Sequence, residues 1–114
     1  MTISEINTML GQTGLQYTYY SWPEDDPDHP VPPLPYIVWY FPNSDNFAAD
    51  DQVYSHIEAL NVELYTRTKD FATEAAVEAV FDANGMVWER EESWLESEKM
   101  YEVLYTMEVF INGE

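Results

Sequence analysis

Side chains with the chemistry for catalysis are few in this sequence. It contains two histidines, His29 and His56, and no cysteine. A Ser-His-Asp triad would need one of these histidines as its base, yet neither lies near a nucleophile motif such as Gly-x-Ser-x-Gly. The four glycines are scattered, so no phosphate-binding loop is present. We therefore predict no catalytic residue, no cofactor-binding residue and no enzyme activity.

Carboxylates are abundant, and carboxylate oxygens suit a hard cation such as calcium. Two groups of aspartates stand out. The first is Asp25, Asp26 and Asp28 beside His29, and the second is Asp45, Asp50 and Asp51. Neither group has the spacing of an EF-hand loop, and neither contains the glycine that such a loop needs for its turn. Solvated acidic loops explain both groups more simply, so we predict no metal site.

The charge balance restricts the partners of the chain. The sequence has 22 acids against four bases and a net charge of −18. Binding to nucleic acid or to an anionic membrane needs clustered lysine and arginine, so both are disfavoured. No apolar run approaches the roughly 20 residues that span a bilayer, and the N-terminus lacks the pattern of a secretory signal. The acidic run 89–98 is typical of a solvated edge strand and turn. The alternative, functional explanation is that these acids line a passage and repel DNA.

A length of 114 residues fits one domain, residues 1–114. A capping box at Thr2 and Glu5 predicts a helix that ends at Gly11 and Gly14, and Asp70 caps a second helix that runs to about Ala83. Patterns of apolar and β-branched residues predict strands at 15–22, 36–41, 55–67, 87–95 and 100–111. The connections are a proline-rich loop, 23–35, and a polar loop with a possible helical turn, 43–54.

The expected fold is a two-layer α+β domain with element order α-β-β-β-α-β-β and a mainly antiparallel sheet. Short connections favour antiparallel pairing of 36–41 with 55–67 and of 87–95 with 100–111. The continuous apolar run 36–41 predicts a central strand. On the second helix we expect Glu74 and Glu78 to face water, and the apolar side to be supplied by residues that include Phe71, Ala75 and Val80.

Two helices can cover only one face of this sheet, yet the last strand carries large apolar residues on both faces. Tyr101 and Met107 share one face, while Leu104 and Phe110 share the other. Either the sheet curls over itself or a partner covers the second face, and tyrosine and tryptophan suit such interfaces. Scattered core and surface aromatics are an equally simple explanation. The candidate interface residues are Tyr36, Trp39, Phe47, Tyr54, Tyr65, Trp94, Leu104 and Phe110.

The order of motifs is familiar. After an N-terminal helix the chain carries four motifs in a fixed order, which are Pro35 to Val38, Asn46 with Asp50, Val62 to Thr66, and the stretch from Trp88 through Tyr105. In this order and spacing the chain resembles the tail terminator, or tail completion, proteins of siphophages and prophages of Gram-positive bacteria. The resemblance covers nearly the whole chain, and the long proline loop 23–35 departs from it.

The resemblance implies a structural virion subunit that forms a homo-oligomeric ring, commonly a hexamer. Such a ring caps the tail tube and joins it to the head-tail connector, so the implied partners are the major tail protein and connector proteins. The implied location is the tail or neck of a virion made in the bacterial cytoplasm. A head-side neck protein, that is, a head completion or minor capsid protein, is the nearest alternative. An acidic DNA mimic that inhibits a host protein is a second alternative, although the acids are not arranged in a spaced double row.

Overall fold

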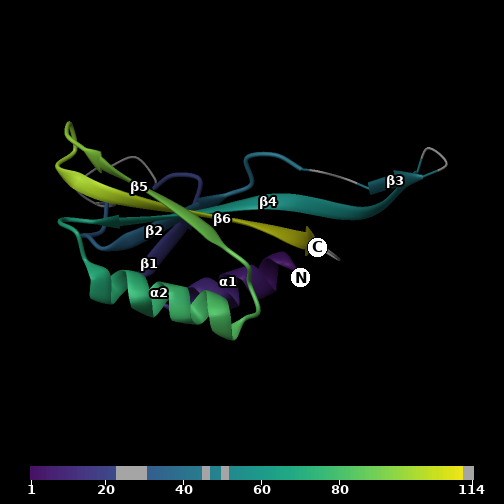
Figure 1. Cartoon of the computed structure of the whole chain (residues 1–114), viewed down its shortest axis with the longest axis horizontal. Coiled ribbons are helices and arrows are strands. Elements are labelled where there is room, and N and C mark those ends of the chain that lie inside the picture. Colours follow the sequence, from purple (N-terminus) through teal and green to yellow (C-terminus); the bar gives the residue numbers. More distant parts are fainter. Residues whose placement is uncertain (23–30, 45–46, 50–51, 112–114) are drawn as a thin grey trace.

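The computed structural model of the chain describes residues 1–22, 31–44, 47–49 and 52–111, with the backbone alone for 47–49 and 52–56. Two helices and six strands make up this described part of the chain (Figure 1). In chain order they are α1 (Ile3–Gly11), β1 (Gln16–Tyr19), β2 (Tyr36–Tyr40), β3 (Phe47–Ala49), β4 (Gln52–Thr66), α2 (Phe71–Ala83), β5 (Glu89–Leu95) and β6 (Met100–Ile111).

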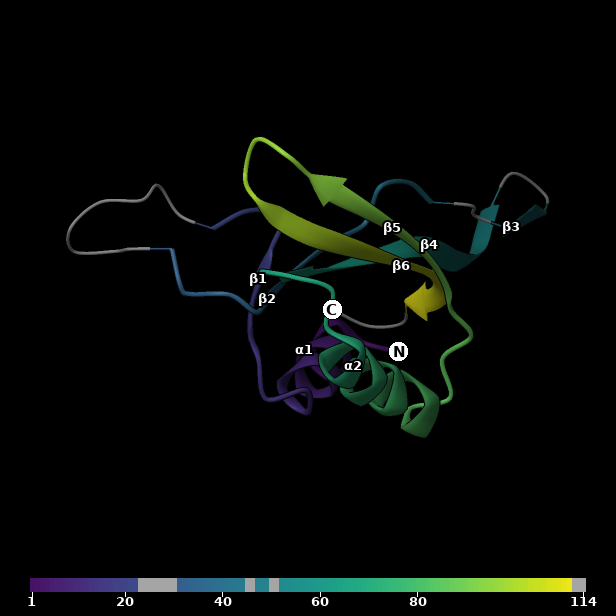
Figure 2. The same cartoon turned by 60° about the vertical axis from the view of Figure 1, so that its left-hand side comes forward.

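The strands form one sheet in the order β1-β2-β4-β6-β5, and β3 pairs with β4 outside this path. The pairs β2–β4 and β5–β6 are antiparallel, as predicted, while β1 runs parallel to β2. Both helices lie side by side on one side of the sheet (Figures 1 and 2). The predicted α+β class, the order of the elements and the two-layer arrangement are therefore confirmed.

Local signals explain where the helices begin and end. The Glu5 amide donates to the Thr2 hydroxyl at 3.1 Å, and the Thr2 amide donates to the Glu5 carboxylate at 2.8 Å, which completes the capping box at α1. At α2 the Thr73 amide donates to the Asp70 carboxylate at 3.0 Å. The chain leaves α2 through Gly85, whose φ of 72° favours glycine.

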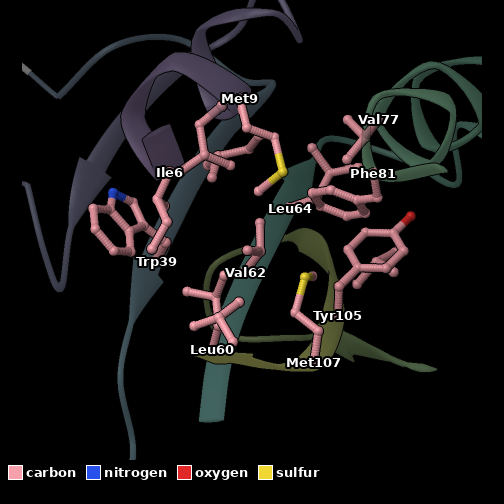
Figure 3. Packing of buried hydrophobic residues seen from close by; sticks show 14 residues of the cluster. Ile6, Met9, Trp39, Leu60, Val62, Leu64, Val77, Phe81, Tyr105 and Met107 are labelled. Carbon is pink, nitrogen blue, oxygen red and sulfur yellow. The ribbon is translucent and has the colours of Figure 1, made fainter. Parts of the chain in front are cut away.

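The core fills the space between the helices and the sheet (Figure 3). Ile6 and Met9 of α1 and Val77 and Phe81 of α2 pack onto alternate residues of the strands. On the strands the fully or nearly fully buried members are Ile37, Trp39, Leu60, Val62, Leu64, Val103, Tyr105, Met107 and Val109. Because side chains alternate along a strand, the residues between these positions belong to the other face of the sheet.

The prediction for the faces of α2 was wrong. Glu74 is buried, with a side chain only 2% exposed, whereas Phe71 is 74% exposed. The Lys69 ammonium lies 2.8 Å from the Glu74 carboxylate, and the Arg90 guanidinium of β5 lies 2.7 Å from the Glu78 carboxylate. These cations offset the cost of placing two acids against the sheet, so the face of α2 that buries Val77 and Phe81 can also bury Glu74.

The segment 43–54 is another correction, because it holds strand where a polar loop was expected. In its described part, Phe47–Ala49 form β3, and β4 already begins at Gln52. Ser44, which lies between β2 and β3, forms an isolated bridge with Glu58 of β4, so β2, Ser44 and β3 together accompany most of the long strand β4. The β3 end of this hairpin projects beyond the helices (Figure 1).

Trp39 tests the position of β2 inside the sheet. It is 3% exposed, and Tyr19 and Phe41 pack edge-on or tilted near its ring. We expect Trp39→Ala to lower the free energy of unfolding by about 3–5 kcal/mol, because a large cavity would open in the core. Denaturant unfolding measures this loss, and Trp94→Ala, at a position 43% exposed, is the matched control. Equal small effects of the two substitutions would contradict the core position of Trp39.

Candidate functional site

The face of the sheet that the helices leave uncovered is the main candidate surface. The register pairs Tyr65 of β4 with Tyr36 of β2 on one side and with Glu102 of β6 on the other. Alternation along each strand then assigns to this uncovered face Tyr36, Val38 and Tyr40 of β2, Ile57, Ala59, Asn61, Glu63 and Tyr65 of β4, and Glu102, Leu104, Thr106, Glu108 and Phe110 of β6. Aromatic, aliphatic and acidic side chains are therefore mixed on it.

A network of tyrosines and carboxylates occupies one end of the uncovered face. The Tyr65 hydroxyl lies 3.0 Å from a Glu63 oxygen and 3.1 Å from a Glu102 oxygen. On the other side, Asn61 donates to the Tyr40 hydroxyl, which lies 3.5 Å from the second Glu63 oxygen. The Tyr65 hydroxyl has one proton, so it donates to only one carboxylate. It can accept a hydrogen bond from the other carboxyl group when that group carries a proton.

The electrostatics of Glu63 agree with such a shared proton. Burial, together with the hydrogen bond and the negative charge of Glu102, raises the pKa of Glu63 from 4.5 to about 7. Burial and the same two carboxylates raise the pKa of Tyr65 well above its usual range, so it stays a neutral donor. Among the described residues no cation forms an ion pair with Glu63, so this carboxylate would gain from one.

A pocket of about 460 Å³ opens beside this network. Aromatic rings form much of its wall, with the Trp22 ring 5.4 Å from that of Tyr36 and the Tyr36 ring 5.5 Å from that of Tyr65, measured between centroids. The Trp22 indole nitrogen is buried and finds no hydrogen-bond partner among the described residues. The lining residues are Tyr20, Ser21, Trp22, Tyr36, Val38, Glu63, Tyr65, Leu95, Glu98 and Met100.

A second apolar area lies at the opposite end of the uncovered face. Phe110 of β6 is 61% exposed and is paired in register with Ile57 of β4. Val87, which precedes β5, is 87% exposed, and it lines a smaller hollow together with Phe110 and Met86. The Phe110 area and the aromatic pocket differ in composition, because the Phe110 area is largely aliphatic around one phenylalanine.

The structure distributes the eight predicted interface residues among different surroundings. Tyr36 and Tyr65 come together in the pocket, and Leu104 and Phe110 lie farther along the uncovered face. Trp39 belongs to the core, so it is not available to a partner. Trp94 lies at the end of β5 against Tyr101, on the side of the sheet that carries the helices. Phe47 and Tyr54 fall in β3 and β4, and their side chains lie outside the described part.

Sequence reasoning missed Trp22, Tyr20 and Glu63 as members of this site. Trp22 and Tyr20 follow β1, and only the parallel pairing of β1 with β2 brings them beside Tyr36 and Tyr40. Glu63 looked like an ordinary polar position in an alternating strand. The alternation of side chains along β4 was an available signal, because it places Glu63 on the same face of the strand as Tyr65.

The acidic run that begins at Glu89 forms the edge strand β5 and the turn to β6, and β5 is exposed for most of its length. This confirms the prediction of a solvated edge.

Within the described residues, no group of three or more histidines and carboxylates is arranged to hold a metal ion. The aspartates at 25, 26, 28, 45, 50 and 51 and His29 lie outside the described part, as does the side chain of His56. None of the described helices is long and apolar enough to cross a membrane.

Comparison with known proteins gives one informative likeness. No protein family matches the chain, and no curated protein matches it. Among solved structures, the chain is similar to a chain of the structure titled "Virion of native gene transfer agent (GTA) particle", with a TM-score of 0.60 and 17% sequence identity. The match covers 92% of this chain and 84% of that chain. At this identity the likeness concerns the fold.

The raised pKa of Glu63 predicts a specific pH dependence of stability. The folded chain holds this proton up to a pH of about 7, whereas the unfolded chain releases it near 4.5. The contribution of Glu63 to the free energy of unfolding is therefore fully present below pH 4.5 and is lost as the pH rises through 7. We expect Glu63→Gln to remove this part of the pH dependence and to be more stable than the unsubstituted protein at pH values above 7.

Denaturant unfolding across this pH range measures the difference between the two proteins. Glu108→Gln is the control, because Glu108 is exposed on the same strand face and outside the network. A Glu63→Gln protein with an unchanged pH profile would contradict the shared proton.

Proposed function

We propose that the chain is a structural subunit of a bacteriophage tail, and specifically a tail terminator. Its copies form a ring, a hexamer, that caps the tail tube and contacts the head-tail connector. The observation that carries this proposal is the uncovered sheet face, on which Phe110 is 61% exposed. The large apolar side chains on this face find cover on neighbouring subunits.

A ring needs a heterologous contact, in which one patch of a subunit meets a different patch of the next. The Phe110 area of the uncovered face is one such patch, and an open edge strand of the sheet, β1 or β5, is a different one. A contact between these unlike patches gives a closed ring where the rotation from one subunit to the next closes.

Three further observations support a role in a virion. The fold is similar to that of a chain in a gene transfer agent virion over most of both chains. The order and spacing of motifs from Pro35 through Tyr105 resemble those of siphophage tail terminators. A net charge of −18 also suits a ring that conducts DNA without binding it.

The alternatives differ in their assembly. A head-side neck protein would also assemble, and its binding to connector rather than tail-tube protein would identify it. An acidic DNA mimic would remain a monomer or dimer and would bind a basic host protein. The mixture of apolar and acidic residues on the uncovered face favours assembly over mimicry.

Self-association and its dependence on Phe110 test the proposal. We expect concentration-dependent oligomers in sedimentation velocity, and stronger association at 0.5 M than at about 0.05 M salt, because salt screens the repulsion between acidic subunits. Phe110→Asp should weaken association at least about tenfold by placing a charge in the contact.

Phe71→Asp is the matched control, because Phe71 is 74% exposed on α2, away from the uncovered face, and Phe110 is 61% exposed. Both variants should stay folded. A protein that remains monomeric at every concentration and salt, or equal effects of the two substitutions, would overturn the ring.

A further inference from the structure

The aromatic pocket beside Glu63 has the chemistry of a site for a cationic side chain. Three rings, those of Trp22, Tyr36 and Tyr65, follow one another at centroid separations of 5.4 and 5.5 Å. The faces of such rings attract cations, and the flat guanidinium of arginine stacks on them especially well. Glu63 and Glu98 add two carboxylates to the lining. A wall of rings together with carboxylates selects for positive charge.

The pocket also has an unused hydrogen-bond donor. The buried indole nitrogen of Trp22 has no acceptor among the described residues. Buried donors of this kind are nearly always satisfied in native structures, so an occupant with an acceptor would complete the site. A peptide segment supplies a backbone carbonyl for this purpose next to its side chain. The donor is an observation independent of the carboxylates, and a peptide carbonyl is one acceptor that would satisfy it.

The cations of the described part of the chain do not fill the pocket. Lys69 pairs with Glu74 and Glu92, Arg90 with Glu78, and Lys99 with Glu96. Arg67 is exposed, but none of the four bases belongs to the pocket lining. A second copy could offer Arg67 only by bringing a body with a net charge of −18 against another of the same charge. Charge complementarity therefore favours a different, basic protein as the source of the cation.

We propose that this pocket binds an arginine side chain of a basic partner protein, with the guanidinium stacked on the aromatic wall and paired with Glu63, and with a partner carbonyl accepting from Trp22. The inference extends the proposed function, since it names the chemistry of a docking partner. It rests on the pocket alone, however, and a chain that does not form rings could still bind arginine.

The charged and titratable groups around Glu63 fix how binding depends on pH. They are Tyr36 and Tyr40 of β2, Tyr65 of β4, Glu102 of β6 and Glu98 of the turn between β5 and β6. The guanidinium pairs with the ionised form of Glu63, whereas the unoccupied pocket holds a proton there up to a pH of about 7. Binding should therefore release this proton and strengthen as the pH rises through that value.

Two short peptides test the proposal, acetyl-Gly-Arg-Gly-amide and the same peptide with neutral citrulline in place of arginine. Their binding is followed through the indole N–H resonances of the protein in nitrogen-15 spectra. The Trp22 resonance should shift with the arginine peptide, with a dissociation constant in roughly the millimolar range for a single side chain. Trp39 in the core and Trp94 on β5 serve as internal references that should not move.

Three comparisons decide the outcome. The citrulline peptide and the Glu63→Gln protein should each bind about tenfold more weakly than the unsubstituted pair, whereas Glu108→Gln should bind normally. Binding should weaken with salt, opposite to the expected salt dependence of self-association, so failure of one proposal is distinguishable from failure of the other. An unmoved Trp22 resonance, equal binding of arginine and citrulline, or unchanged binding by Glu63→Gln would each overturn the arginine site. A further contrary result is that self-association blocks peptide binding and that Arg67→Gln restores it. That result would assign the pocket to Arg67 of a second copy and would also overturn the proposal of a basic partner protein.

Discussion

One-sided coverage of the sheet is the constraint on which the rest of the structure depends. The two helices lie on the same side of the sheet, and the core-cluster residues of β2, β4 and β6 all alternate toward them. Large side chains on the intervening positions then remain outside this cluster. A sheet whose second face carries only polar groups is complete by itself. This one carries Leu104 and the exposed Phe110 there, together with three tyrosines, and it therefore has surface to give to neighbours.

The chain partly answers that constraint with its own polar chemistry. The Tyr40 hydroxyl is hydrogen-bonded to Glu63, and the Tyr65 hydroxyl is hydrogen-bonded to Glu63 and Glu102. These polar groups tolerate water before assembly and can still lose it when a partner arrives, because they already have partners inside the network. The Phe110 end has no comparable network in the described part. The two ends thus suit different kinds of contact, one selective for charge and the other apolar.

Periodicity and capping predicted most of the fold. The Thr2 capping box, the Asp70 cap and the end of the second helix at about Ala83 follow local signals, and they were correct because few tertiary contacts compete with them. The faces of α2 could not be predicted in the same way. Glu74 is buried because Lys69 and Arg90 reach it from elements before and after the helix, which no local pattern reveals. Hairpin strand β3 was missed for a related reason, since its short polar and alanine-rich sequence becomes a strand only beside β4.

The candidate site was predicted in part. Alternation along β6 correctly separated Leu104 and Phe110 from Tyr101 and Met107, and the predicted interface residues Tyr36 and Tyr65 lie together in the pocket lining. Trp39 was placed among interface residues because a large aromatic looks the same in either setting, and only the packing of α1 assigns it to the core. The pocket itself could not be foreseen, because it depends on the parallel pairing of β1 that brings Trp22 next to Tyr36.

The central claim, that neighbours cover the uncovered face, is tested most directly by hydroxyl-radical footprinting of the protein at low and at high concentration. The account predicts that Phe110 and Leu104 become protected on assembly while Phe71, on the outer side of α2, stays as reactive as before. Equal reactivity of Phe110 in the dilute and the concentrated protein, under conditions where oligomers form, would contradict it.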